Sequence, residues 1–529
     1  MLSAQLPRTR PPAPPSTTGR EPIGRAALSV VAVVTLLSVV RAFGPLTYPG
    51  DIWRQSDTAT IARNFATGGM QLFYPQINWG GAGPGYVETE FPLMPWLSAA
   101  LYEVFGEHAW LGRLVSLVFM LVATAAFWGL ARRLLPVRVA RWALVAFAVS
   151  PAFMRYGTAF MPEATVLACY LLALLAFCRW LQEDRRIWLV AAAAATSAAA
   201  LVKPTSLHIG VVLGIWLALA APSRLRRPSL YLAGVAALVA PALWLWHGAR
   251  LHAEYGNTFG VLSGGDSKWG SLALWFSPAF YLGNLKTETI FVYGLVGVPL
   301  AVLGVVWLWR RRSAGTPTGS VFPLVVGGVV ALVVYYFAVG RYSSSDLGIQ
   351  YHIYSLPYAA ICTGAGLAAA AEWLRPRLSA TVFAVVSGLA VVALGAQSVN
   401  VLAESLRSSA GAFGTCADAL TQVSAPGQLV VVGTTSRSVE NGVPNNYQEP
   451  VIFYLADRKG WSLAADQQDP ALLAQYRQEG ARFYVAPDSD LVPAGGALSQ
   501  WLGANATQVR SSGSDGCAVW ALDHPVTTS

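Results

Sequence analysis

The sequence predicts a mostly α-helical protein that crosses a membrane about eleven times and carries a small α/β domain after its last span. Three observations predict this fold class. Only 12% of the 529 residues are charged, about half of the roughly 25% that is usual in soluble proteins. Hydrophobic residues make up 54% of the chain. The positive charges fall in short clusters between long apolar runs, which is typical of a polytopic membrane protein.

Composition also excludes several classes of protein. Five cysteines in a chain of this length are too few for a small disulfide scaffold. The net charge of +9 would suit a nucleic-acid-binding protein, but membrane topology explains the clustering of the charges better, so we expect no nucleic-acid partner. The sequence contains no P-loop and no metal-ligand spacing such as C-x-x-C or H-E-x-x-H, so we expect no metal site.

The apolar runs predict the membrane spans, since a bilayer core takes about 20 residues per helix. The third run is short. The first run resembles a signal peptide, but no A-x-A cleavage site follows it and ten more runs do, so we interpret it as a retained helix. Residues 1–24, rich in proline and arginine, are predicted to be a disordered cytoplasmic tail. The runs cover 26–44, 110–131, 142–156, 163–181, 187–202, 204–221, 229–247, 288–309, 320–339, 351–371 and 379–400.

Arginine placement predicts the orientation of these spans. Short loops carry the excess of positive charge on the cytoplasmic side of a membrane. Alternate loops of this chain carry that excess, so the N-terminus is expected to be cytoplasmic and the C-terminal segment extracytoplasmic. We therefore expect a multi-pass protein of the plasma (inner) membrane. The arginines concerned are Arg132, Arg133, Arg138 and Arg141, then Arg179, Arg185 and Arg186, then Arg224, Arg226 and Arg227, then Arg310, Arg311 and Arg312, then Arg375 and Arg377.

Three segments on the outer side are too long to be simple turns: 45–108, 248–287 and 401–529. The transmembrane part at 25–400 would contain the first two as outer loops. The last segment has strand-like runs at 429–432, 483–486 and 518–522 and helical patterns near 412–423 and 469–480, which predict a small α/β domain. Its two cysteines, Cys416 and Cys517, are either a disulfide or two buried thiols.

The first outer loop supplies two candidate carboxylates. Asp51 follows a Pro-Gly pair, so it is either a turn residue or a functional acid. Asp57 precedes an amphipathic segment with Ile61, Ala62 and Phe65 on one side, so it is either the N-cap of an interfacial helix or a functional acid.

Further acidic residues gather on the same side. Glu88 and Glu90 precede an apolar helix, and Tyr86 stands just before them. Glu163 follows a very short loop, which places it at the membrane surface or just within it. A carboxylate there is costly unless it is paired or hydrated, so it is a functional candidate, although a solvated helix cap is the alternative.

Cations and aromatic residues complete the set. Lys203 is one of four lysines and has apolar spans on both sides; it either snorkels to the interface or serves a site. Arg341, His352 and Tyr354 lie just before or at the start of the tenth run. Under the arginine-derived orientation, all these residues lie on the outer face. That placement suits a substrate with a lipid tail and a charged, sugar-like head.

This arrangement resembles the GT-C superfamily of membrane glycosyltransferases, in particular the family 39 branch that holds protein O-mannosyltransferases and the lipid A aminoarabinose transferase. The resemblance covers residues 26–400. Ile61-Ala62-Arg63 resembles the core of the family's first-loop helix. The family's Asp-Glu pair is replaced here by Arg54-Gln55, between Asp51 and Asp57. Residues 90–97 are similar to a Lys-Pro-Pro-Leu stretch of the family, with Glu90 in place of the lysine. Residues 351–357 resemble its late Arg-Tyr-x-x-Pro motif, with His352 where arginine is usual.

The resemblance implies a sugar transfer from a polyprenyl-phosphate donor to a hydroxyl acceptor outside the cytoplasm, by one inverting displacement and without a metal or other cofactor. In that reading an Asp is the general base, with Asp57 favoured over Asp51, and Glu163 orients the acceptor. Lys203, Arg54, Arg341 and His352 are candidates to bind the donor phosphate. The candidate substrate-binding residues are Glu88, Glu90, Tyr86 and Tyr354.

Two other functions remain open from the sequence. A transporter or flippase of lipid-linked saccharides would be expected to show repeated halves and polar residues in mid-span, and neither is visible. A binding or scaffold protein would fit the missing Asp-Glu pair and the glutamate at position 90. The sequence identifies neither the sugar nor the acceptor.

Overall fold

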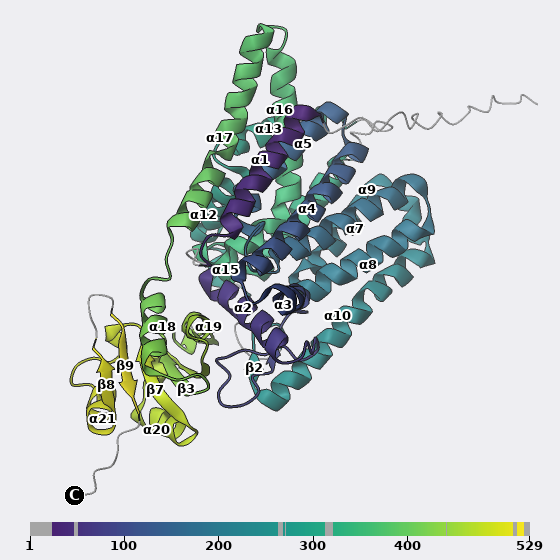
Figure 1. Ribbon diagram of the computed structural model, residues 1–529. Helices are drawn as coiled ribbons and strands as arrows, with labels where there is room; N and C mark the ends of the chain where they lie inside the picture. Colours follow the sequence, from purple (N-terminus) through teal and green to yellow (C-terminus); the bar gives the residue numbers. More distant parts are fainter. Residues whose placement is uncertain are drawn as a thin grey trace, which may run out of the picture.

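The structure, a computed structural model, describes residues 24–46, 51–262, 268–269, 271–312, 321–440, 442–511 and 516–522. The predicted tail at 1–24 lies outside these residues except for Gly24. The described chain is mostly helical. A bundle of long helices lies above two shorter helices, α2 (Ile52–Thr67) and α3 (Leu93–Phe105), and beyond these lies a C-terminal segment with a β-sheet (Figure 1).

The first half of the bundle contains the helices that the apolar runs predict up to residue 247. Proline and serine divide the third run, because Pro151 begins a new helix and the Ser150 hydroxyl caps it by accepting from the backbone N–H of Ala152 at 3.3 Å. The helices are α1 (Arg25–Ala42), α4 (Ala109–Leu134), α5 (Val137–Ala148), α6 (Pro151–Tyr156), α7 (Glu163–Glu183), α8 (Arg186–Val202), η1 (Pro204–His208), α9 (Ile209–Ala220), η2 (Pro222–Arg226) and α10 (Pro228–Tyr255).

The second half is less regular. The eighth predicted run contains a π-helical turn, and the chain bends by 89° where Gly294 separates it from the next helix. The elements are α11 (Leu272–Trp275), α12 (Pro278–Thr287), the π-helix η3 (Glu288–Tyr293), α13 (Gly297–Arg310), α14 (Val321–Ala338), α15 (Gly340–Ser343), the 3-10 helix η5 (Asp346–Ser355), α16 (Leu356–Leu374) and α17 (Ala380–Arg407).

Among the described residues, seven helices are long and apolar enough to cross a membrane, or eight if the bent pair is one span. Three shorter apolar helices, at 93–105, 186–202 and 204–220, accompany them. The protein is therefore a multi-pass membrane protein. The predicted count of about eleven spans is not confirmed, because several of the predicted runs form helices that are too short or are broken.

Close helix contacts depend on small residues. A Cβ atom on Gly304 of α13 would lie 1.8 Å from the carbonyl oxygen of Cys362, and one on Gly366 of α16 would lie 1.9 Å from that of Leu300. Glycine on both helices therefore lets the two backbones approach each other, as is common between membrane helices.

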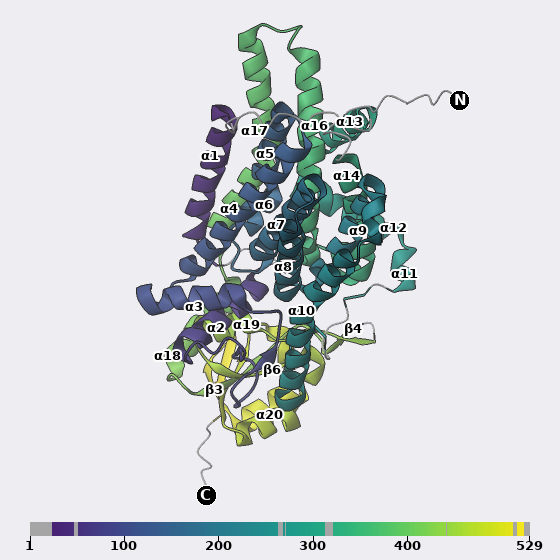
Figure 2. The same ribbon diagram turned by 90° about the vertical axis from the view of Figure 1, so that its right-hand side faces the viewer.

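The arginine-rich turns pair with one another. Arg133 at the end of α4 pairs with Glu183 at the end of α7 at 3.1 Å, and Arg227 before α10 pairs with Asp184. Figure 2 shows the turn between α16 and α17 at the end of the bundle opposite the C-terminal segment. Several arginines also stack on tryptophan rings, an arrangement suited to a membrane interface: Arg132 on Trp128, Arg179 on Trp188, Arg224 on Trp180, Arg311 on Trp307, Arg312 on Trp309 and Arg377 on Trp373.

At the other end of the bundle, α2 (Ile52–Thr67) and α3 (Leu93–Phe105) lie across the helix ends, between the bundle and the C-terminal segment (Figure 2). Strand β1 (Val87–Glu88) follows α2 and pairs in parallel with β2 (Asn257–Thr258) after α10. The predicted outer loops at 45–108 and 248–287 are thus joined to each other.

The C-terminal segment contains a five-stranded sheet in the order β6-β3-β7-β9-β8. Strand β3 is parallel to β6 and β7, whereas β9 is antiparallel to β7 and β8. The strand-like runs of the sequence are β3, β7 and β9. Cys416 and Cys517 form a disulfide with a Cα–Cα distance of 5.6 Å. The elements are α18 (Gly411–Val423), β3 (Leu429–Gly433), β4 (Val439–Glu440), β5 (Val443–Pro444), α19 (Pro450–Ala456), β6 (Lys459–Leu463), η6 (Ala465–Gln467), α20 (Pro470–Gln478), β7 (Ala481–Ala486), η7 (Ser489–Leu491), α21 (Ala497–Asn505), β8 (Thr507–Arg510) and β9 (Ala518–Ala521).

Candidate functional site

Four charged side chains from distant parts of the sequence meet where the bundle joins α2. Arg54 forms an ion pair with Glu90, and Lys203 forms one with Glu163. The Lys203–Glu163 pair is nearly inaccessible to solvent, with side-chain exposures of 9% and 1%. The Arg54–Glu90 pair is more open, at 21% and 18%. We call these four residues the charged cluster.

Each member of the charged cluster is fixed by the end of a helix. Arg54 lies in the first turn of α2, and Glu163 is the first residue of α7. Lys203 stands in extended backbone between α8 and η1. Glu90 precedes α3, and the next residue, Phe91, donates its backbone N–H to the carbonyl oxygen of Leu201 at 3.0 Å. This bond ties the Glu90 loop to the chain that leads into Lys203.

Electrostatic coupling extends through the charged cluster. Burial raises the pKa of Glu90, but the charges of Arg54, Lys203 and Lys268 outweigh burial and hold that pKa below its ordinary value. For Arg54, burial lowers the pKa, whereas Glu90, Asp57 and Glu163 raise it by more. Both groups are therefore charged at neutral pH. The cluster presents two cations to any anion that displaces their carboxylate partners.

Asp57 lies one helical turn after Arg54 on α2 and is 1% exposed. One carboxylate oxygen, Oδ1, accepts a hydrogen bond from the indole N–H of Trp79 at 2.9 Å. The other, Oδ2, is buried and has no hydrogen-bond partner among the described residues. Burial raises the pKa of Asp57 to about 7, against the lowering effects of Trp79 and Arg54. A carboxylate with a free oxygen and a pKa near neutrality is suited to accept a proton.

Asp51 occupies a different setting. It is the residue before α2, and its Oδ2 accepts from Nε of Arg155 at 2.7 Å in an ion pair whose side chains are 2% and 3% exposed. Both side chains of this pair are buried, so it joins the start of α2 to α6. Among the described residues, Asp51 is therefore part of a buried ion pair, whereas Oδ2 of Asp57 has no hydrogen-bond partner.

Tyr354 lies at the inner side of the charged cluster. It is fully buried in η5 and interacts electrostatically with Glu163 and Glu90. The ring of Tyr351, on the same 3-10 helix, lies 5.3 Å from Nζ of Lys203. The tenth predicted run therefore reaches the cluster through its tyrosines.

Two other predicted substrate-binding residues lie apart from the charged cluster. Glu88 is 1% exposed and accepts from the Thr258 hydroxyl at 2.6 Å and from the backbone N–H of Leu262 at 2.9 Å, so it fastens the second outer loop. Tyr86 packs between the rings of Tyr74 and Tyr255, at 5.2 and 5.0 Å.

The structure also places Arg341 away from the charged cluster. Its Nη2 pairs with Glu440 of the C-terminal segment at 2.9 Å, and its backbone N–H donates to Lys268. The strand pair β4–β5, which the sequence did not predict, supplies this partner. Arg341 therefore links the bundle to the C-terminal segment, instead of joining the donor phosphate candidates Lys203 and Arg54.

His352 belongs to a second buried polar group. Its Nδ1 lies 2.8 Å from Glu288 Oε1, and its Nε2 lies 2.8 Å from the Ser343 carbonyl oxygen. Glu288 also accepts from the hydroxyls of Tyr336 and Ser355. Both ring nitrogens of His352 therefore have partners within the protein. Glu288 begins the π-helix; the sequence signal for it was an acidic residue at the start of an apolar run.

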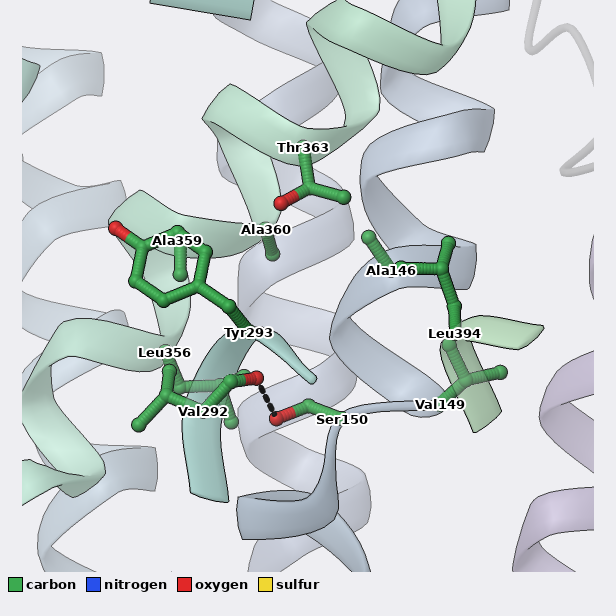
Figure 3. A pocket seen from close by; sticks show the side chains of 10 residues that line it. All are labelled: Ala146, Val149, Ser150, Val292, Tyr293, Leu356, Ala359, Ala360, Thr363 and Leu394. Atoms are coloured by element: carbon green, nitrogen blue, oxygen red, sulfur yellow. Dashed lines mark hydrogen bonds between the residues drawn. The ribbon is translucent and has the colours of Figure 1, made fainter. Parts of the chain in front are cut away.

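A small cavity inside the bundle shares no residue with the charged cluster (Figure 3). Its only polar side chains are Ser150, Tyr293 and Thr363, and the Ser150 hydroxyl donates to the Val292 carbonyl oxygen at 2.7 Å. The remaining lining is aliphatic, so the cavity lacks the charges that a phosphate or a sugar would need.

Glu449 is a residue near Asp57 that is not among the predicted site residues. This residue is 9% exposed, caps α19 by accepting from the backbone N–H of Val451 at 2.9 Å, and interacts electrostatically with Asp57. Burial raises the pKa of Glu449 to about 8. The available signal was a glutamate directly before proline and an apolar helix. No group of three or more His, Cys, Asp or Glu residues in the described ranges is arranged to hold a metal ion.

A part of the chain that contains three members of the charged cluster matches a known protein family. Residues 89–247 match the sequence profile of the family described as dolichyl-phosphate-mannose-protein mannosyltransferase. This match covers Glu90, Glu163 and Lys203 but not Arg54 or Asp57. No curated protein sequence matches the chain.

Solved structures are similar to this chain over most of its length. ArnT from Cupriavidus metallidurans bound to undecaprenyl phosphate is similar with a TM-score of 0.61 and 16% identity over 94% of this chain and 98% of that one. The archaeal oligosaccharyltransferase AglB from Archaeoglobus fulgidus, in complex with an inhibitory peptide and a dolichol-phosphate, is similar with a TM-score of 0.53 and 12% identity. The similarity covers 95% of this chain and 75% of that one. The arabinofuranosyltransferase AftD from Mycobacteria is similar with a TM-score of 0.50 and 16% identity. The similarity covers 95% of this chain and 40% of that one.

The chain has the GT-C glycosyltransferase fold. This confirms the resemblance drawn from the sequence, including the branch near ArnT and the protein mannosyltransferases. The family match and the three neighbours are all to glycosyl- or oligosaccharyltransferases.

Proposed function

We propose that the protein transfers a sugar from a polyprenyl-phosphate-linked donor to a hydroxyl acceptor on the outer face of the plasma membrane. The observation that carries this proposal is the position of Asp57. It is a buried carboxylate with an unpartnered oxygen, one helical turn from a cluster of two cations in a GT-C fold. Two of the similar structures contain undecaprenyl phosphate or dolichol-phosphate, which supports a donor of this class.

Lys203 and Arg54 are the residues we assign to the donor phosphate. Both are held in place by carboxylates, Glu163 and Glu90. A phosphate that enters the charged cluster replaces part of each ion pair, so the buried cations keep an anionic partner. The planar guanidinium group of Arg54 can donate hydrogen bonds to two phosphate oxygens, and the ammonium group of Lys203 acts as a point charge. Glu163, Glu90 and Tyr354 line the same region, and we assign them to orient the acceptor and the sugar.

Asp57 is the proposed general base. The proton of the acceptor hydroxyl passes to the carboxylate of Asp57, and the acceptor oxygen forms a bond to the anomeric carbon. The bond between that carbon and the phosphate oxygen breaks, and the electron pair leaves with the lipid phosphate, whose negative charge Lys203 and Arg54 stabilise. Attack opposite the leaving group inverts the anomeric centre. A general base of this kind contributes about 10²–10⁴-fold.

The proposed orientation follows the arginines. The N-terminal tail and the arginine-rich turns are cytoplasmic, and the C-terminal segment at 401–529 is extracytoplasmic. Residues 25–400 form the catalytic membrane domain. In this orientation the charged cluster and α2 face the outer leaflet, where a lipid-linked donor and a cell-envelope acceptor meet.

The test is transfer by the purified protein in liposomes, with radiolabelled polyprenyl-phosphate sugars as donors and a membrane extract as the acceptor source. The variants are Asp57→Asn, Asp51→Asn and Glu163→Gln, with Trp188→Phe at the opposite end of the bundle as the control. We expect Asp57→Asn to slow product formation by about 10²–10⁴-fold while donor binding remains, and the control to match the wild type. Movement of labelled lipid across the bilayer without any product would instead favour the transporter or flippase alternative.

A further inference from the structure

Helix α19 of the C-terminal segment lies along α2 and contacts it on both sides of Asp57. Near the start of α19, the Gln448 carbonyl oxygen accepts from the indole N–H of Trp53 at 2.5 Å. At its end, Arg63 donates to the Tyr454 carbonyl oxygen at 2.8 Å and pairs with Asp457 at 3.0 Å. Trp53 and Arg63 belong to α2, and Asp57 lies between them in the sequence.

Apolar side chains fill the space between the two helices. Ile61 and Phe65 of α2 share one core with residues of α19, and Ala59 and Ala62 share a neighbouring core with Tyr454. The guanidinium of Arg63 also lies 4.6 Å from the centre of the Tyr454 ring. The buried partners on α19 in the first core are Ile452, Phe453 and Ala456.

The same segment also holds the loop that donates to Asp57. Gly460, at the start of β6, donates its N–H to the Asn78 carbonyl oxygen at 3.0 Å and accepts from the Gly81 N–H at 2.7 Å. Trp79, whose indole N–H reaches Asp57, lies between these two anchor points. Residues 448–460 therefore touch both the helix that carries Asp57 and the loop that supplies its hydrogen-bond donor.

We propose that residues 448–460 form a brace that positions Asp57 for proton transfer, with Trp53 as a positioning residue. This inference rests on the proposed function, in which Asp57 is the base. The brace extends the site beyond the membrane domain to the C-terminal segment, which contains none of the predicted site residues. A displacement of about 1 Å in a catalytic group can cost on the order of 10²-fold in rate, so a helix fastened on both sides of its base has a direct catalytic consequence.

The charged groups that face Asp57 come from three segments. They are Arg54 on α2, Glu90 before α3 and Glu449 at the start of α19. Trp53 adds no charge to this set. Replacing it with phenylalanine therefore removes the anchor to Gln448 without adding or removing a charged group near Asp57.

The experiment compares Trp53→Phe with Trp188→Phe in the full-length protein in nanodiscs. Trp188 is a matched control, because its indole N–H donates to Glu183 at 2.7 Å near the arginine-rich turns. Two readouts are measured: hydrogen exchange of peptides from α2, and the pH dependence of single-turnover transfer. For Trp53→Phe we expect faster hydrogen exchange across residues 54–62 and a transfer rate that is lower by roughly 10- to 100-fold. We also expect the rise of the transfer rate with pH to begin at lower pH, because Asp57 is better hydrated in this variant. The control is expected to match the wild type in both.

Unchanged exchange in α2 of Trp53→Phe would overturn the proposal, whatever the rate. Faster exchange with a wild-type rate and pH profile would also overturn it, because the brace would then be structural only. If the wild-type protein transfers no sugar from any donor, the proposed function fails and the catalytic role of the brace fails with it; hydrogen exchange then shows only whether residues 448–460 hold α2 in place.

Discussion

At the scale of single residues, the two aspartates of the first outer loop differ in what they contribute to stability. Asp51 is half of a buried ion pair with Arg155, whereas no ion pair in the described residues includes Asp57. Removing one partner of a buried pair leaves an uncompensated charge and costs about 3–5 kcal/mol. We therefore expect Asp51→Asn to lower the thermal unfolding temperature clearly. Asp57→Asn should leave it unchanged or raise it. Equal losses in both variants would contradict this distinction.

The same reasoning predicts a pH dependence of stability. Burial raises the pKa of Asp57 from 3.8 to about 7 and that of Glu449 from 4.5 to about 8. The folded state therefore binds protons more tightly than the unfolded state, so this stabilisation is fully present below about pH 4. It is lost as the pH rises through 7 and 8. Thermal unfolding in detergent should show a smaller loss between pH 6 and 9 for Glu449→Gln than for the wild type. A parallel loss in both proteins would show that Glu449 does not titrate in this way.

The sequence indicates which single residues are candidates for a site, but not which residues they pair with. Asp57, Glu163 and Lys203 stood out because polar residues beside apolar spans need an explanation. Their pairing was not predictable, since Glu163 and Lys203 are 40 residues apart. Arg341 and His352 are phosphate candidates because of the family resemblance. The partners that actually hold them, Glu440 and Glu288, depend on tertiary structure.

At the scale of elements, the packing of α13 on α16 gives a prediction with a matched control. A Cβ on Gly304 or Gly366 would lie within 2 Å of a backbone oxygen on the facing helix, whereas Gly388 of α17 has no atom within 4 Å of such a position. Gly304→Ala and Gly366→Ala should each destabilise the protein by about 1–3 kcal/mol. Gly388→Ala should be neutral or stabilising by about 0.5–1 kcal/mol. Thermal unfolding of the three variants is the measurement, and equal effects would disprove the close packing.

Hydropathy predicted where helices occur and failed where they break. All eleven apolar runs contain helix, because apolar length is a local property. The helix break at Ser150-Pro151 comes from a serine cap and a proline. The break at Gly294 is an 89° bend between two helices, which apolar length does not predict. In the C-terminal segment, strand-like runs predicted strands β3, β7 and β9 but not β6, β8 or the short pair β4–β5, whose two-residue strands carry no periodic signal.

At the scale of the whole molecule, the arginine-derived orientation predicts which surfaces water-soluble reagents can reach. Ser223 lies in an exposed arginine-rich turn, and Gln500 lies on an exposed helix of the C-terminal segment. In intact cells, a membrane-impermeant maleimide should label Gln500→Cys and not Ser223→Cys. In inside-out vesicles the pattern should reverse, and the opposite result would invert the proposed topology. The three remaining free cysteines of the described chain are buried and should give little background.

The measurement that tests the central claim most directly is the single-turnover rate of sugar transfer as a function of pH. It compares the wild type with Asp57→Asn under saturating polyprenyl-phosphate sugar. Because a general base acts only when deprotonated and burial raises the pKa of Asp57 to about 7, the wild-type rate should rise with pH, reach half of its maximum near pH 7 and then level off. Asp57→Asn should be slower by about 10²–10⁴-fold and lose this dependence. A half-maximum near pH 4, or an Asp57→Asn variant with the wild-type profile, would contradict the assignment of Asp57 as the base.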